Sequence, residues 1–254
     1  MKKLNILLIA FLAISFSLVS CDKNNDDDDH DHEGTGTVEM KFDYVWGMSN
    51  AAFTMNTDLF HPMTSDTLNV SLFKFYISNV KLKDMDGNWW AEEESYHLVN
   101  ASTASSNTIT LSGVPAAHYT ELSYTIGVDS ARNVSGSQTG ALDPANDMFW
   151  SWNSGYIMMK IEGTKVGGGS FSYHLGGFSG ANNVVSVKST DFGGSHLMLD
   201  ADATKTINLS ANPAKFWHGT GGVDSLPAMI HMPNATATEM ASNFTGSFQF
   251  VSVE

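Results

Sequence analysis

The chain has 254 residues and a formal net charge of −14, with 27 Asp and Glu against 13 Lys and Arg. This acidic balance argues against nucleic-acid binding, because phosphate binding needs clustered Lys and Arg, and Arg132 is the single arginine. Cys21 is the single cysteine, so no disulfide can form within the chain. The fold must therefore be held by burial of apolar surface, which a domain of roughly 220 residues can supply.

The N-terminus carries a predicted export signal. Lys2 and Lys3 precede the apolar run "LNILLIAFLAISFSLVS", so residues 1–20 are expected to be a removable signal peptide rather than a transmembrane helix. "LVSC", residues 18–21, resembles the bacterial lipobox, in which the cysteine is lipidated and becomes the first residue of the mature chain. An ordinary signal peptide with an incidental cysteine is the alternative. The position of Cys21 favours lipidation, and we expect an anchor in the outer membrane, on its periplasmic face or at the cell surface.

Residues 21–35 are predicted to form a solvated acidic tether. The run "DKNNDDDDHDHEGTGT" after Cys21 has no apolar residue before Val38, so it has nothing to bury in a core. Its histidines, His30 and His32, lie among carboxylates and could bind metal weakly, but a charged spacer is the favoured interpretation.

Residues 36–254 are predicted to form one all-β domain, an antiparallel β-sandwich. In "VEMKFDYVW", residues 38–46, apolar side chains alternate with polar ones, as in a half-buried strand. "LNVSLFKFYISNVKL", residues 68–82, also alternates but changes phase after Leu72, which indicates a β-bulge. Asp86-Gly87 is a hairpin-turn signal. Further strand-like runs recur every ten to fifteen residues, separated by Gly, Asn, Asp or Pro.

Two short helices are expected in the loops. In "DPANDMF", Asp143 is a helix cap and Pro144 takes the first helical position. In "TATEMASNF", Thr236 and Glu239 have capping-box spacing.

Sequence motifs for catalysis are not found. There is no Walker loop, dinucleotide fingerprint or G-x-S-x-G elbow. Asp84-x-Asp86-Gly87 resembles the start of a calcium loop, but Trp89 and Trp90 follow where later ligands would be needed, so a hairpin turn is favoured. With no visible nucleophile and base, we expect a protein that is not an enzyme.

Histidine and methionine are the residues that point to a metal. The chain has nine histidines and 13 methionines, and thioethers beside imidazoles suit Cu(I). Methionines that merely fill gaps in the core are the alternative. The candidate ligands are His61, His174, His218, His231 and Met232.

Three stretches together resemble the MbnP-like family of secreted bacterial proteins. They are "LFKFYISNVKL", "YTIGVDSARNVSGSQTGALDPANDMFWSWNSGYIMMKIEG" and "FSYHLGGF", in that order, and the resemblance extends from about Val38 to Phe250. It implies a β-rich extracytoplasmic domain that binds copper through histidines and an oxidised tryptophan (kynurenine). It also implies a partner di-haem enzyme of the MauG type, which makes that modification.

The resemblance makes His174, in "HLGG", the first ligand candidate. His231 with Met232, His218 and His61 are the further candidates, since loops at one end of a sandwich can converge. The candidate oxidation targets are Trp150, Trp152 and Trp217. For "MFWSWNSGY" a structural role is favoured, with its aromatic rings buried.

The sequence thus predicts a lipid-anchored, monomeric copper-binding protein for capture, storage or handover of the metal, most consistent with Cu(I). The alternative is a surface binding or adhesion lipoprotein with the same sandwich and no metal.

Overall fold

The computed structural model describes residues 33–152 and 155–254. The predicted signal peptide, Cys21, His30 and His32 lie outside the described residues. The described residues belong to one compact unit. Among the described residues, no helix combines the length and apolarity needed to cross a membrane.

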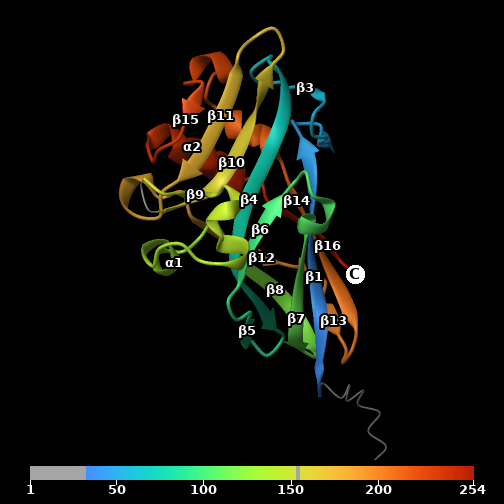
Figure 1. The fold of residues 1–254 in the computed structure, drawn as a ribbon. Helices are drawn as coiled ribbons and strands as arrows, with labels where there is room; N and C mark the ends of the chain where they lie inside the picture. The colour runs from blue at the N-terminus through green and yellow to red at the C-terminus, as the bar shows by residue number, and fades with distance from the viewer. Residues whose placement is uncertain (1–32, 153–154) are drawn as a thin grey trace, which may run out of the picture. The chain divides into compact units, whose positions relative to one another are not determined.

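Strands dominate the described chain (Figure 1). In chain order the strands are β1 (Thr35–Trp46), β2 (Ala51–Ala52), β3 (Asp58–Phe60), β4 (Thr67–Asp84), β5 (Trp89–Ala91), β6 (Tyr96–Asn100), β7 (Thr108–Pro115), β8 (Ala117–Ile126), β9 (Phe149–Trp150), β10 (Gly155–Lys165), β11 (Ser170–Gly176), β12 (Ser186–Asp191), β13 (Leu197–Leu199), β14 (Thr204–Ala211), β15 (Met229–Ile230) and β16 (Gln249–Val253). The α-helices are α1 (Ser130–Val134) and α2 (Ala235–Thr245). The short 3-10 helices are η1 (Ala104–Asn107), η2 (Gly140–Leu142), η3 (Pro144–Asn146), η4 (Gly180–Asn182), η5 (Pro213–Trp217) and η6 (Val223–Ser225).

The strands form two sheets, which confirms the predicted all-β sandwich. The smaller sheet has the order β16-β14-β1-β2, with β7 also paired to β1, and the larger has the path β12-β8-β4-β10-β11-β15. Two strand pairs depart from the predicted antiparallel arrangement. β1 pairs with β14 in parallel, and β11 pairs with β15 in parallel. The second of these pairings builds the candidate site.

Strand β4 is the centre of the larger sheet and contains the predicted bulge. Its pairing with β10 shifts register between Glu162 and Gly163, which pair with Leu72 and Val70. The extra residue, Ser71, shifts the buried side chains from even-numbered to odd-numbered positions. The phase change in the sequence predicted a bulge at this place. At this point a Cβ on Gly163 would lie 2.1 Å from the carbonyl oxygen of Asn69, so β10 needs glycine there.

Aromatic rings fill the space between the sheets. Phe42 of β1 meets Phe75 of β4 edge to face at 5.8 Å, and Phe73 contacts Phe244 of helix α2 at 5.4 Å. Each of these side chains is fully buried or nearly so, and burial of one such ring stabilises the fold by about 1.5–3 kcal/mol. Because the chain has no disulfide, this aromatic cluster is the main source of stability of the domain.

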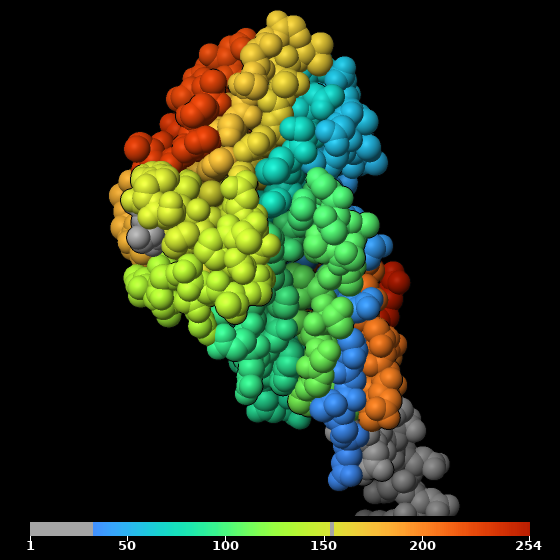
Figure 2. Space-filling view, viewed as in Figure 1, coloured from blue at the N-terminus to red at the C-terminus, as the bar shows by residue number. Residues whose placement is uncertain are grey.

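The opposite face of the larger sheet is covered by the segment from α1 to β9. Tyr76 of β4 donates a hydrogen bond to the carbonyl of Ala141 (3.1 Å), and Tyr156 of β10 donates one to that of Leu142 (2.9 Å). Figure 2 shows this yellow-green segment as a continuous layer of surface. The face of the sheet that carries the polar side chains of β10 and β11 is therefore only partly open to solvent.

The two predicted helices are present, with one change. Asp143 caps η3 as predicted, accepting from the Ala145 amide at 2.8 Å. Helix α2 is capped by Asn234, whose side chain accepts from the Ala237 amide at 2.8 Å, and not by Thr236 as predicted. Thr236 lies inside the first turn, since the helix begins one residue before it.

Replacing Asn234 with Ala should lower the free energy of unfolding by about 1 kcal/mol, because the first turn of α2 loses its side-chain acceptor. Thr236→Ala is the matched control and should cost less than about 0.5 kcal/mol. Urea unfolding followed by circular dichroism measures both. A larger loss for the Thr236 variant would show that the capping assignment is wrong.

Candidate metal centre

The candidate site lies on the face of strand β11 that points away from the core. Phe171, Tyr173 and Leu175 face inward and are buried. The residues between them alternate to the other side, which places Ser172 and His174 together. His174 pairs with Lys160 of the neighbouring strand β10, and Ser172 pairs with Glu162.

The parallel pairing of β15 with β11 brings His231 to the same place. Ser172 is in register with Met229, and Tyr173 with Ile230. The next pair along is His174 with His231, whose rings stack with centroids 3.9 Å apart and planes inclined by 13°. Two of the histidines predicted as ligands are therefore in direct contact, although 57 positions separate them in the sequence.

The two rings point their Nε2 atoms at one hydroxyl group. Ser172 Oγ lies 3.2 Å from Nε2 of His174 and 2.8 Å from Nε2 of His231. Glu162 Oε1 lies 2.6 Å from Nε2 of His174 and 3.2 Å from Ser172 Oγ. The position of the Ser172 hydroxyl is thus a point within 3.2 Å of both imidazole nitrogens.

The surroundings favour a neutral imidazole at His174. Burial lowers the pKa of His174, and the hydrogen bond to Glu162 opposes this only in part. Burial would raise the pKa of Glu162, but the hydrogen bond with His174 and the charge of Lys160 hold it below its usual value. A neutral imidazole is the form that binds a metal ion.

A buried cation stands beside the pair. Lys160 is 3% exposed, forms an ion pair with Asp147, and has its Nζ 3.9 Å from Glu162 Oε1. Its charge contributes to the low pKa of His174. The site is thus two imidazoles and the Glu162 carboxylate, joined through the Ser172 hydroxyl, with the Lys160–Asp147 ion pair beside them.

Two exposed methionines flank His231. Met232 follows it directly and is 56% exposed, and Met229, in register with Ser172, is 63% exposed. Among the described residues, no group of three or more His, Cys, Asp or Glu side chains is arranged to hold a metal ion. Metal binding at this place would therefore depend on the two imidazoles, with thioethers as the further soft donors.

Of the three candidate tryptophans, Trp150 lies nearest along this face. Its indole packs over Gly176, where a Cβ would come within 2.4 Å of it, and Gly176 is two positions beyond His174 on the same face of β11, about 7 Å along the strand. Trp150 is 5% exposed, whereas Trp152 is 62% exposed and lies against it at 5.4 Å. Oxidation of a tryptophan, and the partner di-haem enzyme, stay predictions.

Trp217 lies on the opposite side of β11. It is fully buried and contacts Phe171 edge to face at 5.3 Å, and Phe171 faces the core. Because Trp217 is buried on the core side of β11, it is separated from the stacked histidines.

His61 and His218 lie apart from the stacked pair. His61 is 2% exposed; its Nε2 lies 2.8 Å from the Ala214 carbonyl, and its Nδ1 accepts from the Thr64 amide at 3.2 Å. Both ring nitrogens thus have partners that connect η5 to the turn after β3. His218 is exposed and lines a small hollow with His61. The structure does not bring these two residues to His174.

Ser172, Glu162 and Met229 are site residues that the sequence analysis did not single out. The sequence does contain a signal for Ser172 and Met229. In "SYH" and "MIH" each of them stands two residues before a histidine, and therefore on the same face of a strand as that histidine. What the sequence does not show is that these two tripeptides pair in register.

The sequence model of the MbnP family, described as MbnP, matches residues 35–232. The chain belongs to the MbnP family. Among solved structures, MbnP from Methylosinus trichosporium matches with a TM-score of 0.46 and 14% identity, over 69% of this chain and 76% of that chain. No curated protein matches the chain. At the level of the family, membership supports a copper-related extracytoplasmic role.

The stability of the fold should fall on acidification through the pH range in which His174 would titrate. Its folded pKa is below the ordinary value of 6.5, so below that pH the unfolded chain binds more protons and acid favours unfolding. One such group contributes at most about 1.4 kcal/mol per pH unit.

Urea unfolding at pH 7.5, 6.5 and 5.5 should therefore show a steeper loss for the wild type than for His174→Gln. His196→Gln, which removes an exposed histidine, controls for the loss of a histidine as such. Equal slopes for the wild type and the His174 variant would contradict the assignment.

Proposed function

We propose that the protein is a lipid-anchored extracytoplasmic copper-binding protein that holds Cu(I) at His174 and His231, for capture, storage or handover of the metal. The observation that carries the proposal is the convergence of both Nε2 atoms on the Ser172 hydroxyl, at 3.2 and 2.8 Å. The copper ion is the cargo of the protein, and no reaction step is assigned to it. The membrane anchor rests on "LVSC" at residues 18–21.

The donor set suits a soft ion. Imidazole nitrogens bind copper, zinc and nickel, whereas thioethers select Cu(I). The methionines nearest in sequence to His231 are Met229 and Met232. The single cysteine, Cys21, is committed to the lipid anchor in this proposal. A site with few donors also favours Cu(I), which is satisfied by two or three ligands.

The neighbouring charges are compatible with a bound cation. The buried ammonium group of Lys160 pairs with Asp147 and lies 3.9 Å from Glu162, so two carboxylates neighbour one ammonium group. Glu162 also lies 2.6 Å from His174 Nε2. The preference for Cu(I) over Cu(II) therefore rests on the soft donors and not on the local charge.

Exposure of the methionines provides a route for handover. His174 has a side chain that is 13% exposed, while Met229 and Met232 are more than half exposed. An incoming ion can meet the flexible thioethers first and exchange onto the less accessible imidazoles. This order of contact fits a protein that receives copper from solution or from another carrier.

Loading with Cu(I) under anaerobic conditions, followed by desalting and elemental mass spectrometry, tests the proposal. The full chain, with His30 and His32 replaced by Ala to silence the tether, should retain about one copper. His174→Ala and His231→Ala should each lose at least nine-tenths of it. His218→Ala, which removes an exposed histidine away from the pair, is the matched control and should retain it.

If the His218 variant loses copper and the other two variants retain it, the copper site lies on the other side of β11. If every form elutes without copper, the metal-binding hypothesis is wrong, and the alternative of a surface binding or adhesion lipoprotein is supported instead.

A further inference from the structure

A second group of soft donors lies on the other flank of the larger sheet. Three strands, β4, β10 and β11, lie between β8 and β15 in the sheet, and in Figure 1 β5 and β13 lie low in the view while β11 and β15 lie high. Here Met198 of β13 is the cross-strand partner of His118 of β8. Cross-strand partners project from the same face, so the thioether and the imidazole are neighbours.

Met85 flanks His118 on its other side. It follows the last residue of β4, and its amide donates to the His118 carbonyl at 2.9 Å. The result is a lateral row, Met85–His118–Met198, across three adjacent segments of backbone. Neighbouring strands are about 4.8 Å apart, so the outer two backbones are separated by about 10 Å, a span that two flexible thioether side chains can close over a central imidazole.

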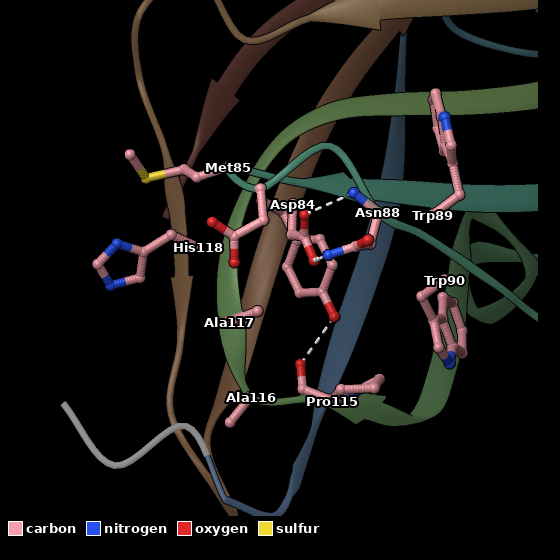
Figure 3. A pocket seen from close by; sticks show the side chains of 11 residues that line it. Asp84, Met85, Asn88, Trp89, Trp90, Pro115, Ala116, Ala117 and His118 are labelled. Carbon is pink, nitrogen blue, oxygen red and sulfur yellow. Dashed lines mark hydrogen bonds between the residues drawn. The ribbon is translucent and has the colours of Figure 1, made fainter. Parts of the chain in front are cut away.

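The row faces outward. Leu197, Leu199 and Tyr119, which alternate with it, are at most 2% exposed. Met85 is 57% exposed and Met198 54%, so neither thioether fills the core. Figure 3 shows the side chains of Met85 and His118 directed to the same side, away from Trp89 and Trp90.

Local charge at the row favours a cation. Met85 and His118 line a hollow of about 560 Å³ together with Asp84 and Asp86. The carboxylate of Asp84 accepts hydrogen bonds from Asn88 (2.8 and 3.1 Å), which help hold its pKa below the usual value although burial acts in the opposite direction. A negatively charged rim raises the local concentration of cations, and the row supplies two thioethers and an imidazole, which prefer a soft one.

We propose that Met85, His118 and Met198 form a second, surface-exposed binding site for a soft monovalent cation, Cu(I) or Ag(I). The site is separate from the stacked histidines and does not require them. Because its two thioethers are more than half exposed, it would bind more weakly than a buried imidazole pair and exchange ions faster. That property suits first capture of the ion at the protein surface.

Titration of the full chain with Ag(I), followed by NMR of ¹³C-methyl methionine, tests this directly. Ag(I) avoids copper redox chemistry, and the methyl signals of Met85 and Met198 are assigned by their loss in Met85→Leu and Met198→Leu. Both signals should shift along one binding curve, and His118→Gln should weaken that binding at least tenfold. Met48, which is 74% exposed and outside the row, is the internal control and should not move at the same Ag(I) concentration.

The double variant His174→Ala/His231→Ala separates the two sites. In that background the Met85 and Met198 shifts should persist, whether or not the stacked histidines bind copper. The proposal is overturned if the two methyls move no earlier than Met48. It is also overturned if His118→Gln leaves their curve unchanged, or if Met85→Leu leaves the Met198 response intact.

Discussion

A parallel pairing between β11 and the two-residue strand β15 determines which side chains meet at the candidate metal centre. The register of Ser172 with Met229 and of Tyr173 with Ile230 sets His231 beside His174. A slip of one residue would turn His231 to the other face, because side chains alternate along a strand. The chain after β15 continues into α2, whose buried Phe244 stacks on Phe216 at 4.4 Å in the core. The aromatic core thereby fixes the position of a short strand whose own hydrogen bonds are few.

The donor set then decides what the site can hold. Burial lowers the pKa of His174 and so favours its neutral form, and Lys160 is paired with Asp147 and lies 3.9 Å from Glu162. Two imidazole nitrogens with one carboxylate beside them are a poor site for a hard divalent ion, which needs several oxygen ligands. It is a reasonable site for a monovalent soft ion, and the exposed thioethers beside it extend the same preference to the surface.

Much of the fold could be predicted from the sequence, because its signals are local. The phase change after Leu72 predicted the bulge that the β4–β10 register shows, and Asp143-Pro144 predicted the capped turn at η3. The cap of α2 was assigned to Thr236 because the capping-box spacing fits it, but Asn234 is equally able to cap and lies where the chain enters the helix. Local chemistry alone does not choose between two good caps.

The candidate site was predictable only in its parts. His174 stood among the candidates because "HLGG" resembles the family pattern, and His231, His218 and His61 were the further candidates. Their separation depends on which face of β11 each one approaches, and that follows from the pairing of segments more than fifty residues apart. His61 illustrates the ambiguity: from the sequence it looks available, yet both its ring nitrogens are occupied by backbone groups.

Copper binding at the stacked histidines is tested by a crystal structure of the Cu(I)-loaded chain with anomalous data collected at the copper edge. We predict one dominant anomalous peak in contact with a ring nitrogen of both His174 and His231, close to the position of the Ser172 hydroxyl. A dominant peak beside His61 and His218, or no peak at the stacked histidines in a loaded crystal, would contradict it.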